Sequence, residues 1–185
     1  QAFISALESE VDGLKTDLAK DQNRQVYGDG SGAIAVAGTL TAGTNTFLAK
    51  DAMYAQSGMQ IDIIDGTTLG NPNPTVKASN RQITGINVST NVITFDGAVV
   101  STAVGDIVVR TGNVNREWTG FTKIFKTTGS LYNIDPATEP IWAAVVDSNS
   151  GVNRPLSEGL MIALADSIRT NGGKTTAIFS NLGVR

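Results

Sequence analysis

The first residues of the chain carry a hydrophobic pattern that predicts one long α-helix. Apolar residues recur every three or four positions and so share one helical face; they are Phe3, Leu7, Val11, Leu14 and Leu18. A helix over residues 2–26 would be about 37 Å long, about twice the usual length. Because its apolar face is single and narrow, we expect this helix to lie across another body rather than inside a core.

A glycine-rich stretch follows in NRQVYGDGSGAIA, residues 23–35, with glycines at 28, 30 and 32. Helices commonly end on a residue with positive φ, which glycine adopts without steric cost. The pattern therefore predicts that the helix ends near Gly28 and that residues 33–37 form a short strand. The alternative, an anion-binding loop, needs a strand before its glycines and a helix after them, the reverse of this order. A calcium loop would need more oxygen ligands than Asp29 and Ser31 offer.

Residues 53–112 change to the two-residue alternation of β-strands. The apolar positions lie at 59–63, 83–86, 92–95 and 107–109. Turn signals separate them at Ser89–Asn91 and at Asp96–Gly97, and the second is typical of a β-hairpin. About four to six short strands are expected, which favours a small β-barrel. Residues 38–50 are predicted to be a loop or a weak strand.

The last third of the chain predicts further short elements. The spacing of apolar residues indicates a helix from Trp118 to Phe125, ended by Gly129. Residues 131–134 are typical of a short strand or hairpin arm, and residues 141–146 form another apolar run.

A clearer helix is predicted after Pro155. Ser157 suits its N-cap, and Leu156 and Met161 have the spacing of a hydrophobic staple. Its core stripe is Leu160, Leu164 and Ile168, and Asn171-Gly172-Gly173 would end it. Thr176–Phe179 is predicted to be a buried strand.

Composition narrows the functions that remain. Only 17% of the 185 residues are charged, below the ~25% of ordinary soluble domains. The net charge of −3 lies in residues 1–30, and the rest of the chain is balanced, so no basic surface indicates tight nucleic-acid binding. The lack of Cys and His excludes disulfides, thiolate chemistry and ordinary zinc or haem sites. No apolar run reaches the ~18 residues of a membrane span.

Two carboxylate pairs and one lysine motif are candidate chemical sites. Asp62 with Asp65, or Asp96 with Asp106, could act as the paired carboxylates of a glycosidase, although Asp65 and Asp96 precede glycines and suit turns. Gly173-Lys174-Thr175 resembles the end of a phosphate-binding loop, but neither the required earlier glycine nor a following helix is predicted.

Three further residues suggest binding or modification. Asn87 begins a match to a glycosylation acceptor and is interpreted as a turn residue. Trp118 and Trp142 are predicted to be core residues rather than ligand platforms. We therefore expect no catalytic, cofactor-binding or metal-binding residue.

The order of the segments resembles a known family. A long helix runs into NRQVYGDGSGAIA, and a β insert, EWTGFTKIF, GSLYNIDPATEPIWAAVV and RPLSEGLMIALADSIRTNGGKTTAIFSNLGVR follow. This order is similar to that of the major capsid protein of tailed bacteriophages, the Hong Kong 97-like fold that encapsulin compartments share. The resemblance covers most of the chain, is best over residues 1–37 and 114–185, and depends on order rather than on one diagnostic motif.

The resemblance implies an α+β fold in three parts. Residues 1–50 would hold the spine helix and the entry to the axial domain, residues 51–112 an inserted β-barrel on the outer face of the capsid, and residues 113–185 the mixed axial domain with its sheet. It also implies a non-enzymatic subunit of an icosahedral phage head, assembled in the bacterial cytoplasm and found in the virion. Its partners would be copies of itself in capsomers, together with scaffolding, portal or decoration proteins. It would enclose DNA without reading its sequence and would not contact a membrane.

The chain departs from the family at both ends. Family members usually have an N-terminal arm and an extended loop before the spine, and further strands after the region that matches Gly183-Val184-Arg185. The chain also opens on Gln1 rather than Met. We therefore expect a fragment that does not build shells by itself. Two other functions stay open: a β-barrel protein of a phage tail or baseplate, and a carbohydrate-binding or glycoside-acting module that uses Trp118, Trp142 and the aspartates.

Overall fold

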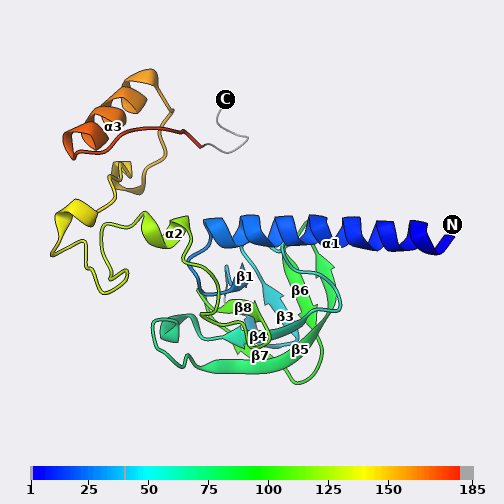
Figure 1. The fold of residues 1–185 in the computed structure, drawn as a ribbon. Helices are drawn as coiled ribbons and strands as arrows, with labels where there is room; N and C mark the ends of the chain where they lie inside the picture. The colour runs from blue at the N-terminus through cyan, green and yellow to red at the C-terminus, as the bar shows by residue number, and fades with distance from the viewer. Residues whose placement is uncertain (1, 40, 180–185) are drawn as a thin grey trace. The chain divides into compact units, whose positions relative to one another are not determined.

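The computed structural model describes residues 2–39 and 41–179 and divides the chain into two compact units, residues 1–121 and 122–185. We call them the N-terminal and C-terminal units. The N-terminal unit combines one long helix with a curled antiparallel sheet (Figure 1), so the fold is mixed α+β. The part of the family resemblance that rests on residues 180–185 lies outside the described residues.

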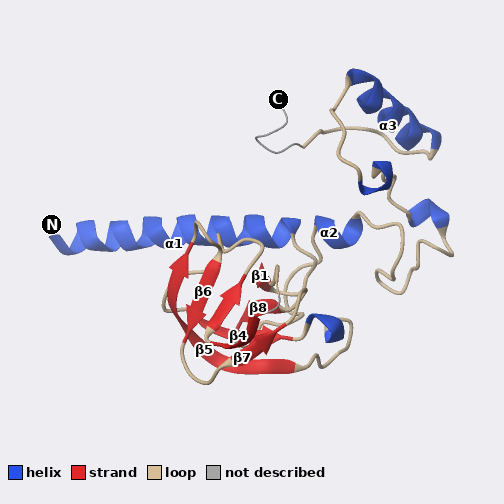
Figure 2. Cartoon of the chain, turned by 180° about the vertical axis from the view of Figure 1, so that it is seen from behind, coloured by secondary structure: helices blue, strands red, loops and turns tan. Residues whose placement is uncertain are grey.

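Helix α1 (Ala2–Tyr27) is continuous over 26 residues, which confirms the predicted helix (Figure 2). All described side chains from residue 4 to residue 20 are exposed. The predicted apolar face therefore exists but does not lie against a core. The side chain of Phe3, the first member of the predicted stripe, is outside the described residues.

The main sheet has six antiparallel strands that curl into a half-barrel. Their spatial order is β1 (Ala33–Val36), β8 (Ile107–Arg110), β4 (Gln60–Ile64), β5 (Val76–Asn87), β6 (Val92–Phe95) and β3 (Thr46–Leu48). A separate pair consists of β2 (Thr41–Thr44) and β7 (Val100–Thr102). Two backbone hydrogen bonds link the edges of the curled sheet, from Gly38 N to Leu48 O (3.0 Å) and from Lys50 N to Val36 O (2.8 Å).

The sheet spans the domain boundary that was predicted between residues 50 and 51. Strand β1 pairs with β8, and β3 pairs with β6, so strands on both sides of that boundary share one sheet. Their side chains form two buried clusters. The largest fully buried members of the main cluster are Phe47, Phe95, Ile61, Ile63, Ile83, Ile93 and Val108. A smaller cluster consists of Ile64, Ile107 and Val109.

The turn predicted at Asp96–Gly97 forms, but the strands before and after it do not pair with each other as a hairpin would. Gly97 has a φ of +81°, so the chain does turn at Asp96–Gly97. However, the next strand, β7, pairs with β2 rather than with β6, because β6 is already flanked by β5 and β3. The true hairpin joins β5 to β6 through residues 88–91, where the other turn was predicted.

The C-terminal unit contains short elements and one longer helix. Helix α2 (Phe121–Ile124), which begins at the last residue of the N-terminal unit, is shorter than predicted. Two 3₁₀ turns follow at Pro140–Trp142 and Asn149–Gly151. Helix α3 (Glu158–Thr170) confirms the helix predicted after Pro155, and its N-cap Ser157 accepts a hydrogen bond from Leu160 N (3.4 Å).

Two strand predictions in this unit are not met. Residues 131–134 form a tight turn closed by a bridge between Leu131 and Ile134. The buried strand predicted at Thr176–Phe179 is wrong, because these residues are exposed and form no strand. Over residues 114–179 the structure has no sheet that could provide a pairing edge, and the axial sheet that the resemblance implies is not formed there.

Candidate assembly surface

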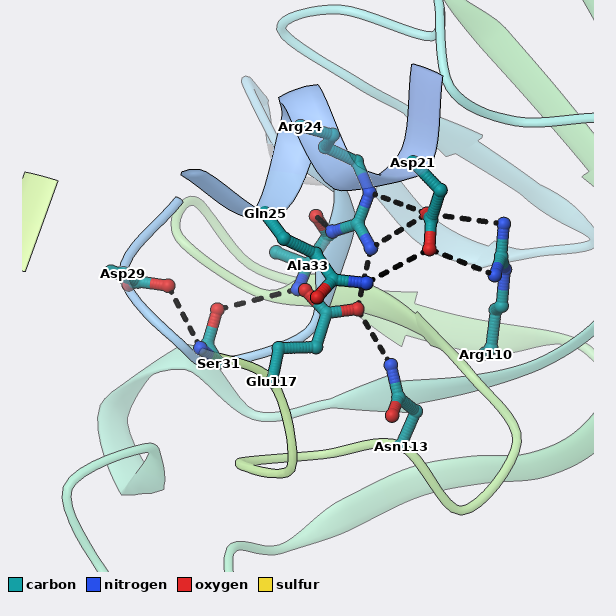
Figure 3. Close-up of polar contacts among 9 residues, drawn as sticks. All are labelled: Asp21, Arg24, Gln25, Asp29, Ser31, Ala33, Arg110, Asn113 and Glu117. Atoms are coloured by element: carbon teal, nitrogen blue, oxygen red, sulfur yellow. Dashed lines mark hydrogen bonds and ion pairs between the residues drawn. The ribbon is translucent and has the colours of Figure 1, made fainter. Parts of the chain in front are cut away.

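Helix α1 is attached to the sheet by charged side chains in its last two turns (Figure 3). Arg24, only 6% exposed, donates to the carbonyl oxygen of Ala33 in β1 (2.9 Å) and to Glu117 Oε1 in the loop after β8 (2.5 Å). Asp21, one turn earlier, accepts hydrogen bonds from Arg24 Nη2 (3.0 Å) and Arg110 Nη1 (3.4 Å), and Arg110 Nη2 forms an ion pair with it at 3.2 Å. Two guanidinium groups and two carboxylates therefore alternate between the helix, the sheet and the loop. We call these four charged residues the anchor network.

Within the anchor network each buried charge has a partner of opposite sign. Burial acts to raise the pKa of Asp21, but the hydrogen bond from Arg24 and the charges of Arg110 and Arg24 outweigh it and hold the pKa below its usual value. Burial acts to lower the pKa of Arg24, and the hydrogen bond and charge of Glu117 raise it instead. Asn113 Nδ2 donates a further bond to Glu117 (2.7 Å). The network is thus stable in its charged form.

The glycine stretch after α1 serves backbone geometry, as predicted. Gly30 and Gly32 have φ of +86° and +83°, whereas Gly28 is not in the left-handed region, so the positive φ comes later than expected. The Asp29 carboxylate accepts from Ser31 N (3.0 Å) (Figure 3). Because a side chain already occupies that N–H group, it is not directed at an external anion.

Gly120 contacts the end of α1 in a way that the sequence did not indicate. A Cβ at this position would lie 2.5 Å from each of three backbone carbonyl oxygens at the end of the helix and just after it, those of Gln25, Val26 and Gly28. Nearby, the rings of Tyr27 and Phe121 pack edge to face with centroids 5.6 Å apart. The loop before α2 therefore closes over the carbonyl end of the helix.

The candidate carboxylates of the β region stabilise loops. Asp62 is buried and accepts from the backbone N–H groups of Asn80 (2.7 Å) and Gly112 (2.9 Å). Asp65 accepts from Thr67 N (2.9 Å) as the N-cap of a 3₁₀ turn at Gly66–Thr68. The first proposed pair is thus engaged with the protein's own backbone.

The second pair is engaged in the same way. Asp106, 1% exposed, accepts from Gly66 N (3.0 Å) and Ala103 N (2.7 Å) and forms an ion pair with Lys77 Nζ (2.6 Å). Asp96 accepts from Gln82 N (2.8 Å). These contacts give each of the four carboxylates a structural role in the β region.

The structure also tests the predictions made for the two tryptophans, for Asn87 and for Lys174. Trp118 and Trp142 are 60% and 63% exposed, so the prediction that they are core residues is wrong. The β core is already filled by aliphatic and Phe side chains, and Trp142 lies in residues 122–179, which have almost no buried side chains. Asn87 accepts from Ser89 N (3.1 Å), which confirms the predicted turn. Lys174 is followed by neither a helix nor a strand over residues 175–179, so the phosphate-loop mechanism has no structural basis.

Helix α1 presents a continuous apolar row to solvent. Its members are between 55% and 71% exposed; they are Ile4, Leu7, Val11, Leu14 and Leu18. We call these five residues the α1 seam.

The C-terminal unit also leaves its apolar side chains uncovered. Within residues 122–179, Pro136 is the one buried residue. Ile141, Tyr132 and Ile178 are 85%, 79% and 75% exposed. A cavity of ≈ 240 Å³ lies beside Trp142, and a second of ≈ 200 Å³ lies between residues 147–156 and α3. Over residues 122–179, the unit therefore has apolar surface to cover but no core of its own.

Comparisons with protein families, curated proteins and solved structures gave no match to this chain. Across the described parts of the chain, no helix has the length and apolar character needed to cross a bilayer. In the same residues, no cluster of three acidic side chains is arranged to bind a metal ion.

Proposed function

We propose that this chain is a non-catalytic structural subunit of an icosahedral phage head, with a Hong Kong 97-like fold, that associates with copies of itself. The observation that carries the proposal is the distribution of apolar surface. The curled sheet has a complete core, whereas α1 and the C-terminal unit expose their apolar side chains. Soluble monomers rarely expose such surfaces, and contacts between identical subunits commonly bury them.

The unbroken first helix supports the head rather than the tail. A tail or baseplate protein would share the Thr/Gly/Asn-rich β region but would not need a long helix followed by an axial domain. Helix α1 is unbroken, although the body that it contacts is a β-sheet with loops. The proposal therefore requires that residues 113–179 form the axial sheet in the shell, where other chain segments supply strands that pair with them.

The proposal includes partners and location. Copies of the same chain would form capsomers in the virion, with scaffolding, portal or decoration proteins as further partners. DNA would be enclosed without sequence-specific contacts, because the charges outside residues 1–30 are balanced. The aspartates that suggested catalysis are engaged in loop contacts, which supports a role without chemistry.

Immunogold electron microscopy tests the proposal. Antibodies raised against the chain should label the heads of particles made by the phage whose genome encodes it. Mass spectrometry of purified particles should find the chain as the most abundant head protein. Labelling confined to the tail would overturn the proposal and support the tail or baseplate alternative.

The carbohydrate-binding alternative keeps one supporting observation, the exposed Trp142 beside an apolar cavity. The same cavity is lined by Lys123 and Lys126 and by no carboxylate, so it favours binding over hydrolysis. Retention of the chain on insoluble bacterial cell-wall polysaccharide, lost in Trp142→Ala but not in Trp118→Ala, would support this alternative.

A further inference from the structure

The α1 seam has the spacing and the residue types of a two-stranded coiled coil. From Ile4 the apolar residues recur at steps of three, four, three and four, which is the alternation of a and d positions in heptads. Ile4, Val11 and Leu18 stand at a, and Leu7 and Leu14 stand at d. Two of the three a residues are β-branched, and β-branched residues at a with Leu at d favour a parallel dimer.

The charges beside the seam favour the same arrangement. Glu10 occupies a g position and Lys15 the following e position. In a parallel pair, each g residue faces the next e residue of the partner, so Glu10 meets Lys15 of the other copy twice. An antiparallel pair over the same seam would instead bring Glu10 close to Asp17 of the other copy, a repulsive contact, and Glu8 close to Lys15, an attractive one. These two contacts offset each other, so the charges favour the parallel pair.

The structure leaves this seam accessible and shows where it ends. Every described side chain from residue 4 to residue 20 is exposed, so a second helix can approach without displacing the sheet. The next d position is Asp21, which is bound to Arg24 and Arg110 in the anchor network. Gly13, at a c position, lies outside the seam with nothing within 4 Å of its virtual Cβ.

We propose that α1 pairs in parallel with α1 of a second copy of this chain, through the α1 seam and reciprocal Glu10–Lys15 ion pairs. The inference deepens the proposed function, because it names one contact by which copies associate. The seam spans little more than two heptads, so the isolated dimer is weak and forms in the micromolar range or above. Repetition of the contact in an assembly would raise its effective strength.

Sedimentation equilibrium of the chain between about 1 and 200 µM tests the pairing, with dissociation constants compared between variants. Lys15→Glu places two acids opposite each other and should weaken the dimer by about fivefold or more. Glu10→Lys combined with Lys15→Glu restores opposite charges and should recover the dimer. Lys20→Glu is the matched control: Lys20, like Lys15, stands three residues after an Asp, but it occupies a c position, so dimerisation should not change.

Two further variants test the seam and its direction. Leu14→Lys should abolish the dimer while leaving the fold intact, because Leu14 is 71% exposed. Ile4→Cys introduces the one cysteine of the chain, and oxidation should link two copies, since equivalent a positions meet only in a parallel pair.

The outcomes separate the two proposals. A chain that stays monomeric at 200 µM, or a dimer in which Ile4→Cys does not crosslink, would overturn the helix pairing and leave the head-labelling result unaffected. Labelling of the tail would overturn the head proposal. If Lys15→Glu still weakened the dimer and Glu10→Lys combined with Lys15→Glu still restored it, the helix pairing would stay in place.

Discussion

Replacement of Arg24 by Met is the sharpest test of how α1 is held. Met keeps much of the length and apolar stem of the side chain, so the change removes the charge and the donors rather than the packing. Arg24 reaches three partners: Asp21 (3.0 Å), the Ala33 carbonyl (2.9 Å) and Glu117 (2.5 Å). In Arg24→Met the Glu117 carboxylate, 6% exposed, loses its ionic partner.

The expected cost follows from that unpaired charge. Removal of one member of a buried ion pair usually destabilises a protein by about 3–5 kcal/mol, because the other charge stays buried. Asn113 still donates to Glu117, and Arg110 still faces Asp21, so both remaining carboxylates keep one contact. We therefore expect a loss of about 3 kcal/mol, the lower end of that range. Adding Glu117→Gln to Arg24→Met removes the buried charge and should regain about 1 kcal/mol.

Urea unfolding followed by tryptophan fluorescence measures this loss. A Trp142→Phe background leaves Trp118, the neighbour of Glu117, as the one reporter. The midpoint should fall with little change in slope, since the same surface becomes exposed. Arg169→Met is the control, because its ion pair with Asp166 is long (3.6 Å) and highly exposed, and it should cost no more than about 0.5 kcal/mol. If Arg24→Met costs as little as the control, the network does not secure α1.

Three further predictions concern the same helix. Gly120→Ala should destabilise the N-terminal unit by about 1–3 kcal/mol in thermal unfolding, because its Cβ would lie 2.5 Å from three carbonyl oxygens, whereas Gly70→Ala, with nothing within 4 Å, should change little. The lowered pKa of Asp21 means that its stabilising contribution is present above the unfolded-state value of about 3.9 and is lost as the pH falls through the lower folded value. Urea midpoints measured from about pH 6 to pH 2 should therefore decline in the acid range less steeply in Asp21→Asn than in the unchanged chain. Gly13→Ala should raise the helical stability of α1 by up to about 1 kcal/mol, seen as slower loss of circular dichroism at 222 nm on heating, and an unchanged signal would contradict this.

The elements that could be predicted from the sequence are those fixed by local periodicity. Helix α1, helix α3 and strands β4, β5, β6 and β8 follow apolar repeats of the right period and end at recognisable caps or turns. The pairing of strands depends instead on which edges are free. The turn at Asp96–Gly97 was visible, but nothing local shows that β6 already has two neighbours and that the next strand joins β2.

The contacts that secure α1 could not be predicted for a similar reason. Asp21 and Arg24 stand one turn apart, which is visible in the sequence, but Glu117 lies 93 residues beyond Arg24. A single sequence gives no signal for that pair. Thr176–Phe179 shows the opposite error: its apolar run has the composition of a strand, yet a strand also needs a neighbouring edge, and none is present in residues 114–179.

The two parts of α1 differ in what they contact: its last two turns are attached to the sheet, and its earlier turns expose the α1 seam. This difference favours the proposed assembly role of the helix. Ion pairs in partly buried sites contribute more to geometry than to net stability, because desolvation offsets much of their attraction. The planar fork of Arg24 fixes the direction of its bonds, whereas an apolar contact would let the helix slide or rotate. Attachment through Asp21 and Arg24 therefore sets the direction of α1 and leaves the α1 seam uncovered. In the proposed assembly α1 would need both properties, since a fixed direction makes every contact between copies equivalent and an exposed seam makes each contact possible.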